Sequence, residues 1–278
     1  MRKDVLKHLR KDYRVWICGI YLLVVILVAV FAPLIAPHEY NEMDSSRRLA
    51  SPSPTHIFGT DEFGRDIFTR IIYGARLTLI VSVGAVVISS ISGTILGLIA
   101  AFYGGWVETA IMRLMDIILC FPSMLLAMFV MTLLGPSTLN LIITIGVLYI
   151  PRFARIVYSV SLAAKEMEYV EASKAVGASV PRTLFKGILP NIMAPIFVQM
   201  SLALGTAVIT ESGLSFLGLG PPPPMPSWGR IIEQSARYVR LSPWVLIWPS
   251  LAISLTILAF NILGDALRDN LDPRLRHS

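Results

Sequence analysis

Five stretches of the chain, each longer than twenty residues, contain no Asp, Glu, Lys or Arg; they are 15–37, 77–107, 117–151, 187–210 and 241–264. A hydrocarbon core of about 30 Å is crossed by about 20 apolar helical residues. Because lipid offers no hydrogen-bond partners, the backbone of each stretch must satisfy its own polar groups as a helix. Charged residues make up only 15% of the chain, against about 25% in soluble domains. The sequence therefore predicts an all-α integral membrane protein.

The longest of these stretches is interrupted by Gly135-Pro136-Ser137-Thr138, which is typical of a tight turn. It therefore predicts two helices in place of one. The whole chain then has six predicted transmembrane helices: 15–36, 77–101, 111–134, 139–157, 190–212 and 244–264. A cleaved signal peptide is the rival interpretation of the first, and it is disfavoured because the run is long and no small-residue cleavage site follows it.

Basic residues predict the orientation. They gather in the N-terminal tail 1–14, around the connection between the fourth and fifth spans, and in the C-terminal tail 265–278. With six spans these segments share one side, which the positive-inside bias assigns to the cytoplasm. The membrane domain then covers 15–264, with external segments at 38–76 and 213–243. The net charge of +6 needs no nucleic acid to explain it.

The two external segments carry motifs of different kinds. The first contains Gly59-Thr60-Asp61-Glu62-Phe63-Gly64-Arg65-Asp66, whose glycine spacing approaches that of a phosphate-binding loop. We reject that interpretation because arginine and aspartate replace the lysine and hydroxyl that the loop needs, and a structural turn is favoured. The second continues from a glycine-rich strip into Pro221–Pro224, which excludes regular helix. It is either a stiff cap over a pathway exit or a rigid connector.

The predicted cytoplasmic loop 158–189 has the features of a compact helical elbow. Residues from Met167 to Ala175 favour helix, and Gly177 permits a turn that other residues resist. Ser179 is placed to cap a second short helix, with Pro181 in its first turn, and Pro190 opens the next span. Such an elbow either presents a face to a partner protein or is an ordinary loop between spans.

Few residues within the predicted spans suggest chemistry. Glu211, near the outer end of the fifth span, marks a pathway or reaches the lipid headgroups, and Phe216 follows it as a candidate gate. Arg113 and Asp116 are spaced for a structural i,i+3 ion pair. Gly93 and Gly97 predict close helix packing, and Pro122 and Pro151 predict kinks. Cys18 and Cys120 lie in different spans and predict neither a disulfide nor a zinc site.

The elbow resembles the EAA loop of permease subunits of bacterial ATP-binding-cassette importers. The match rests on Glu171, Ala172, Gly177, Leu189 and Pro190, whereas Ser173 and Gly187 depart from the usual alanine and isoleucine. The resemblance implies that these residues dock on an ATPase subunit. The residues expected to couple to the ATPase are Tyr169, Glu171, Ala172, Ser173, Gly177, Ala178, Leu189 and Pro190.

Further motifs extend the resemblance to the dipeptide, oligopeptide and nickel permease group, and within it to the C-type permease of dipeptide importers. They are Gly59-Thr60-Asp61 with Gly64-Arg65-Asp66, Tyr73–Arg76, Met112-Arg113 with Asp116, Phe216–Gly220 before Trp228-Gly229, and Ala259–Pro273. The resemblance implies transport of short peptides, with a second homologous permease, two ATPase subunits and an external solute-binding protein as partners. ATP and Mg²⁺ are then expected on the partner subunits, and this chain is expected to bind no cofactor and to have no catalytic residue.

Other functions fit the sequence less well. An importer of nickel or another small solute is the alternative within the same group, although His38 and His56 are poor support for a nickel pathway or any metal site. A secondary transporter would usually carry more intramembrane ionisable groups or paired broken helices. A membrane enzyme is disfavoured because all four histidines lie outside the predicted spans. A structural scaffold would not require the elbow.

Overall fold

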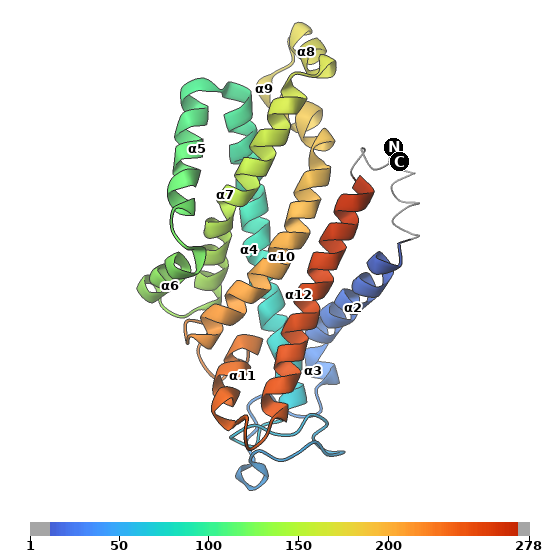
Figure 1. The fold of residues 1–278 in the computed structure, drawn as a ribbon, viewed down its shortest axis with the longest axis vertical. Helices are drawn as coiled ribbons and strands as arrows, with labels where there is room; N and C mark the ends of the chain where they lie inside the picture. Colours follow the sequence, from blue (N-terminus) through green and yellow to red (C-terminus); the bar gives the residue numbers. More distant parts are fainter. Residues whose placement is uncertain (1–11, 272–278) are drawn as a thin grey trace.

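The computed structural model describes residues 12–271, and helices dominate this part of the chain (Figure 1). The long apolar helices are α2 (Tyr13–Val30), α4 (Ile67–Tyr103), α7 (Thr138–Lys165), α10 (Met193–Phe216) and α12 (Trp244–Leu271). Two helices of intermediate length are α5 (Gly105–Leu119) and α6 (Ser123–Leu134). The short helices are α3 (Ala32–Ile35), α8 (Glu168–Ala175), α9 (Val180–Arg182) and α11 (Trp228–Ser235). The predicted all-α membrane class is confirmed, with five or six helices suited to crossing a membrane.

Helix α4 lies at the centre of the bundle and packs along α7. The closest approach occurs at Gly93 and Gly97: a Cβ atom at Gly93 would stand 2.5 Å from the Cβ atom of Phe153, and one at Gly97 would stand 2.6 Å from the carbonyl oxygen of Ala154. Side chains larger than hydrogen would therefore force the two helices apart. The predicted close packing at these glycines is confirmed. A buried apolar cluster that includes Val81, Phe153 and Leu214 joins α4, α7 and α10 around this contact.

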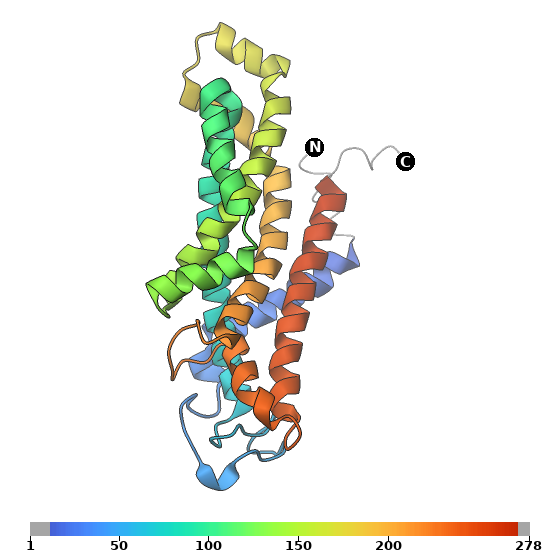
Figure 2. The same ribbon diagram turned by 60° about the vertical axis from the view of Figure 1, so that its left-hand side comes forward.

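The predicted span 111–134 is broken into two helices at Pro122, where the sequence predicts a kink. Helices α5 and α6 are bent by 88° at residues 120–122. The cause is local, because proline lacks a backbone N–H and disfavours helical geometry in the residue before it, and Pro122 is the N-cap of α6. Figures 1 and 2 show α5 running from one end of the bundle, α6 crossing it, and α7 returning. The pair is either one broken span, which gives six candidate crossings, or a re-entrant loop, which leaves five.

Several helices extend beyond the predicted spans. Helix α4 begins at Ile67, ten residues before the predicted 77, and its first turns carry Arg70, which is 2% exposed. Its guanidinium donates to the side-chain oxygen of Gln234 at 2.9 Å and lies 3.5 Å from the carboxylate of Asp61. Asp61 offsets the charge and Gln234 accepts one N–H of the guanidinium, which helps the helix to include a buried arginine. Similarly, α7 runs to Lys165 and α12 to Leu271.

The connections separate onto two ends of the bundle (Figures 1 and 2). Helix α8 projects from one end, and the segments 36–66 and 217–243 lie at the other. The start of α2 lies beside the end of α12, where Arg14 donates to the carboxylate of Asp269 at 3.0 Å. The predicted sharing of one side by the tails 1–14 and 265–278 and the loop 158–189 stays a prediction, because residues 1–11 and 272–278 lie outside the described chain. Which end faces the cytoplasm stays a prediction.

Candidate functional site

The elbow occupies residues 166–191 and consists of two short helical pieces joined at a glycine. Helix α8 ends in a turn where the N–H of Ala178 donates to the carbonyl of Ser173 at 3.1 Å. Gly177 in that turn has φ +73°, a left-handed conformation that glycine adopts without strain. Helix α9 then continues into a π-helical segment, 183–188, and a 3₁₀ turn, 189–191. Ser179 occupies the predicted N-cap position, but its side chain makes no capping hydrogen bond.

The inner side of the elbow is tied to the membrane helices by a buried apolar cluster. Val170 of α8 is fully buried, and Leu184 and Ile188 of the π-helical segment are 5% and 1% exposed. The same cluster contains Leu98 of α4, Val157 and Ala164 of α7, and Ile192 and Ile196 at the start of α10. The elbow is therefore packed onto the ends of three long helices, so a force on it is transmitted to all three.

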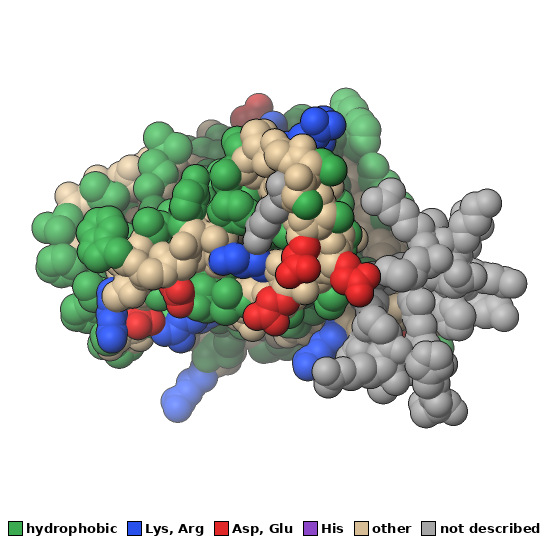
Figure 3. All heavy atoms as spheres, turned by 90° about the horizontal axis from the view of Figure 1, so that it is seen from above, with side chains coloured by type: hydrophobic (Ala, Val, Ile, Leu, Met, Phe, Trp, Pro, Cys, Tyr) green, Lys and Arg blue, Asp and Glu red, His purple; other side chains and the backbone are tan. Residues whose placement is uncertain are grey.

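The outer side carries the residues that the sequence predicted to couple to an ATPase. Tyr169, Glu171, Ala172, Gly177 and Pro190 are exposed, whereas Ser173, Ala178 and Leu189 are half-buried. Figure 3, which views the molecule from this end, shows acidic side chains gathered at the elbow, where Glu166, Glu168 and Glu171 are exposed. This surface is open on the described chain. Its role in coupling stays a prediction.

Three apolar residues on this surface were missed by the sequence reasoning. Val176 is 84% exposed, Met167 54% and Phe185 49%. A cavity of about 360 Å³ opens at Met167, and it is also lined by Tyr169 of α8, by residues near the end of α7 and by residues at the start of α10. Exposed apolar side chains in polar surroundings are the available signal for such a surface. Their exposure depends on the fold, so the signal becomes visible only once the elbow is built.

Glu211 is fully enclosed by protein, so its predicted reach to the lipid headgroups is wrong. It is 0% exposed, and its two carboxylate oxygens accept hydrogen bonds from Thr78 of α4 at 2.8 Å and Ser215 at 2.7 Å. The side chain thereby ties α4 to α10. The alternative that Glu211 marks a pathway stays a prediction, as does a gate at Phe216, which is 43% exposed at the end of α10.

Asp116 is paired with a different arginine from the one predicted. Arg155 of α7 donates to its carboxylate at 2.5 Å, and within residues 12–271 no ion pair joins Asp116 to Arg113. The partner lies on a neighbouring helix because the carboxylate meets α7, while Arg113 is exposed. The two partners are 52% and 40% exposed, so the pair connects helices without a buried charge.

The turn at 59–66 is held by charged side chains and is not a phosphate-binding loop. Arg65 donates through Nε to the carboxylate of Asp61 at 2.6 Å, and Asp61 also accepts the backbone N–H groups of Phe63 and Arg65. Glu62 is 6% exposed, and burial together with the charge of Asp61 raises the pKa of its carboxyl group. The predicted structural turn is confirmed. The carboxylates of Asp61 and Glu62 would repel a phosphate group, and the backbone N–H groups of Phe63 and Arg65 already donate to Asp61.

Comparison with known proteins agrees with this architecture. Residues 93–277 match the family described as "Binding-protein-dependent transport system inner membrane component", and residues 1–52 match the "N-terminal TM domain of oligopeptide transport permease C".

Curated relatives match along nearly the whole chain. A dipeptide transport system permease protein of Alkalihalophilus pseudofirmus is 45% identical over 99% of this chain and 90% of its own length. A glutathione transport system permease protein of Pectobacterium atrosepticum is 41% identical over 93% of this chain and 86% of its own length. A di/tripeptide transport system permease protein of Pseudomonas aeruginosa is 40% identical, with coverages of 93% and 88%. The chain therefore belongs to the inner-membrane permeases of binding-protein-dependent ATP-binding-cassette importers, in the branch of the C-type peptide permeases.

Proposed function

We propose that this chain forms one half of a translocation pathway for short peptides and that its elbow docks on a separate ATPase subunit. The observation that carries the proposal is the division of the elbow into two sides. Val170, Leu184 and Ile188 are buried in a cluster with residues of the membrane helices, while Met167, Val176, Phe185 and Glu171 of the same elbow are exposed. A segment that only connected two spans would have no need of an exposed apolar surface on a packed base.

The same division supplies a route for mechanical coupling. A partner that moves the exposed side of the elbow also moves the cluster of Val170, Leu184 and Ile188. That cluster includes residues at the ends of α4, α7 and α10, and close-packed interiors transmit displacement with little compression. Closure of the ATPase then rotates the helices that surround the pathway, and the cavity opens alternately to the two sides of the membrane.

The remaining parts of the assembly are proposed from the family. A second, homologous permease completes the pathway, two ATPase subunits hold ATP and Mg²⁺, and an extracytoplasmic protein delivers the solute. Relatives named as dipeptide, di/tripeptide and glutathione permeases support a short peptide as that solute. This chain contributes no catalytic residue and binds no cofactor in this scheme.

Cysteine cross-linking tests the docking. Val176→Cys, at a site 84% exposed on the elbow, is compared with Leu34→Cys, at a site 82% exposed in α3 at the opposite end. Both are placed in a Cys120→Ser background, because Cys120 is an exposed free thiol. We expect only Val176→Cys to cross-link to the co-expressed ATPase subunit and to respond to ATP. Equal cross-linking of Val176→Cys and Leu34→Cys to the ATPase subunit, or no cross-linking of Val176→Cys, would refute the docking surface.

Uptake measurements test the solute separately. Cells that carry the complete importer are supplied with labelled dipeptides, with glutathione and with Ni²⁺. We expect dipeptide uptake that depends on this chain and competition among short peptides. Uptake of Ni²⁺ alone would refute the peptide assignment while leaving the docking result unaffected.

A further inference from the structure

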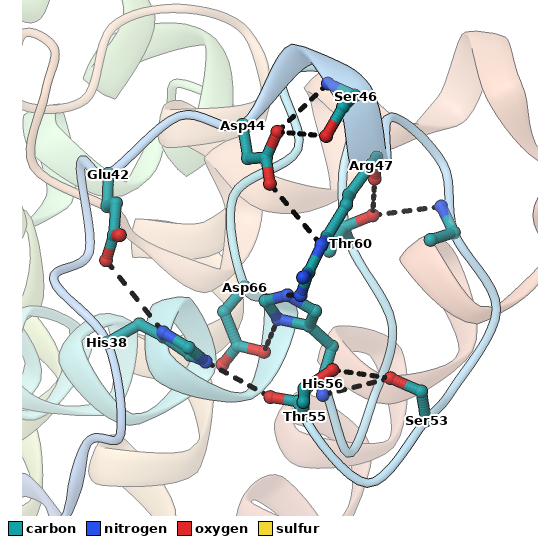
Figure 4. A network of polar contacts seen from close by, with 11 residues as sticks. His38, Glu42, Asp44, Ser46, Arg47, Ser53, Thr55, His56, Thr60 and Asp66 are labelled. Atoms are coloured by element: carbon teal, nitrogen blue, oxygen red, sulfur yellow. Dashed lines mark hydrogen bonds and ion pairs between the residues drawn. The ribbon is translucent and has the colours of Figure 1, made fainter.

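The segment between α3 and α4 brings together three side chains with ligand atoms suited to a transition metal. His38 follows α3, His56 lies in the middle of the segment, and Asp66 is the N-cap of α4. One ligand atom from each lies within 4.8 Å of the others, and the two imidazole rings stack with centroids 4.8 Å apart. His56 and Asp66 are 7% and 3% exposed. Figure 4 shows the Asp66 carboxylate joined to His56 by a dashed line, with the His38 ring beside them.

The surroundings of these side chains favour a cation. They line a cavity of about 200 Å³ whose wall also contains Glu42, Asp44 and Arg47. Three carboxylates therefore face one guanidinium around the cavity. Because the cavity is partly withdrawn from water, screening of these charges is weaker than on an open surface.

The distance between His56 and Asp66 is close to that of two ligands on one ion. Nδ1 of His56 lies 3.0 Å from Oδ1 of Asp66. Zinc bonds of about 2.0–2.2 Å in a tetrahedral site place two ligand atoms about 3.3 Å apart, so a shift of a few tenths of an ångström admits the ion. Oδ2 of Asp66 accepts the backbone N–H of Thr69 at 2.8 Å, which fixes the carboxylate and leaves Oδ1 for the metal.

An oxygen atom lies near each ring nitrogen of His38, one of them at hydrogen-bond distance. Its Nε2 lies 3.1 Å from the carbonyl oxygen of Thr55, and its Nδ1 lies 3.8 Å from the carboxylate of Glu42. Metal-binding histidines almost always donate their second ring N–H to a carbonyl or a carboxylate. Whichever nitrogen of His38 takes the metal, an oxygen is therefore placed near the other.

Arg47 opposes the ion and thereby offers a sharp test. Nη1 of Arg47 lies 3.2 Å from Nε2 of His56, so Nε2 accepts a hydrogen bond and the single proton of the neutral ring sits on Nδ1, toward Asp66. A metal at Nδ1 requires that this proton move to Nε2 and that Arg47 turn away. Arg47 is half-exposed and also pairs with Asp44 at 3.4 Å, so it has space and an alternative partner.

We propose that His38, His56 and Asp66 form a binding site for a divalent transition-metal ion of the zinc type. The bound ion links the chain that leaves α3 to the chain that enters α4, and so fastens the segment at this end of the molecule. Imidazole and carboxylate ligands suit zinc and its neighbours better than Mg²⁺ or Ca²⁺, which prefer all-oxygen sites.

The test measures Zn²⁺ binding by calorimetry on the purified full-length chain, without a polyhistidine tag and after chelator treatment. The background protein carries His8→Ala, His277→Ala and Cys120→Ser, which removes the other two histidines and the exposed thiol. We expect one Zn²⁺ per chain, with at least tenfold weaker binding in His38→Ala and in Asp66→Asn. Asparagine retains the capping ability of Asp66, so the helix start is preserved.

Arg47→Gln is the decisive variant, because a gain of affinity cannot result from misfolding. The amide oxygen can accept the N–H of Nε2, and the positive charge is removed, so we expect about tenfold tighter binding, the size of a typical outer-partner effect. Absence of binding in the background protein, or binding that His38→Ala leaves unchanged, would overturn the proposal. Weaker binding in Arg47→Gln would overturn the assigned role of His56.

Discussion

Thr78 of α4 donates a hydrogen bond to the carboxylate of Glu211 of α10, with 2.8 Å between Oγ1 and Oε2. Ser215 donates to the other carboxylate oxygen at 2.7 Å, and the whole side chain is enclosed by protein. In a lipid environment a polar group of this kind needs internal partners. The hydroxyl groups provide them, and the carboxylate in turn fixes the distance between α4 and α10.

Glu211→Ala is expected to destabilise the protein. The substitution removes the carboxylate that accepts hydrogen bonds from the hydroxyl groups of Thr78 and Ser215. A buried polar group that loses its hydrogen-bond partner destabilises the folded state by about 1–3 kcal/mol. Glu211→Gln keeps the shape and one accepting oxygen, and is expected to lose less. Thermal unfolding in detergent measures both. Equal midpoints for the two variants would show that the hydrogen bonds do not hold α4 and α10 together.

Gly177→Ala is expected to impair coupling to the ATPase. Alanine at φ +73° costs about 1–2 kcal/mol, which the elbow can relieve only by distorting the turn after α8. Gly187→Ala is the matched control, because a Cβ atom added at either glycine would meet open space, but only Gly177 has a positive φ.

The measurement for these glycines is the amount of ATPase that co-purifies and the rate of solute uptake. We expect a several-fold loss of both in Gly177→Ala and little change in Gly187→Ala. If the two variants behave alike, the left-handed turn is not required for docking.

Gly93→Ala is expected to lower the stability of the α4–α7 pair. The added methyl group would meet Phe153 and the backbone carbonyl of Ile150 at 2.5 and 2.8 Å, and overpacking of this kind costs typically about 1–3 kcal/mol. Gly19→Ala in α2, where nothing lies within 4 Å of the new atom, is the control and should unfold at the wild-type temperature or above. If Gly93→Ala unfolds at the same temperature as the wild type, α4 and α7 accommodate the added methyl group without a loss of stability.

The apolar runs predict the long helices because a membrane span is specified by local composition. Their ends are less predictable, since they depend on residues far away in the sequence. The charge of Arg70 suggests the end of a span, yet Asp61 lies 3.5 Å from its guanidinium and Gln234, 164 positions away, accepts a hydrogen bond from it. The bend at Pro122 was expected as a kink, but its size depends on how α6 crosses the bundle.

In the candidate sites, too, features set by neighbouring residues could be predicted, whereas contacts between residues far apart in the sequence could not. The turn at Gly177 is a local motif and was predicted by its residue type. Asp116 was assigned to Arg113, three residues away, whereas its partner Arg155 is 39 residues away on α7. His38, His56 and Asp66 are spread over 29 residues without a ligand motif, so only the fold places them together.

Glu62→Gln is expected to change how stability depends on pH. Burial, aided by the neighbouring charge of Asp61, raises the pKa of the Glu62 carboxyl group above 4.5 in the folded protein. Between that ordinary value and the raised one, the folded state binds more protons than the unfolded state, so the free energy of unfolding falls as the pH rises through this window. The contribution of the protonated carboxyl group is therefore fully present below the window and lost above it.

Glutamine carries no charge at any pH and removes this dependence. The unfolding midpoint of Glu62→Gln relative to wild type is therefore expected to rise from pH 4.5 to pH 7 in thermal scans. Glu166→Gln, at an exposed site on the elbow, controls for the change in net charge. A difference that stays constant with pH, or that runs in the opposite direction, would show that Arg65, 3.5 Å from the Glu62 carboxylate, outweighs the burial.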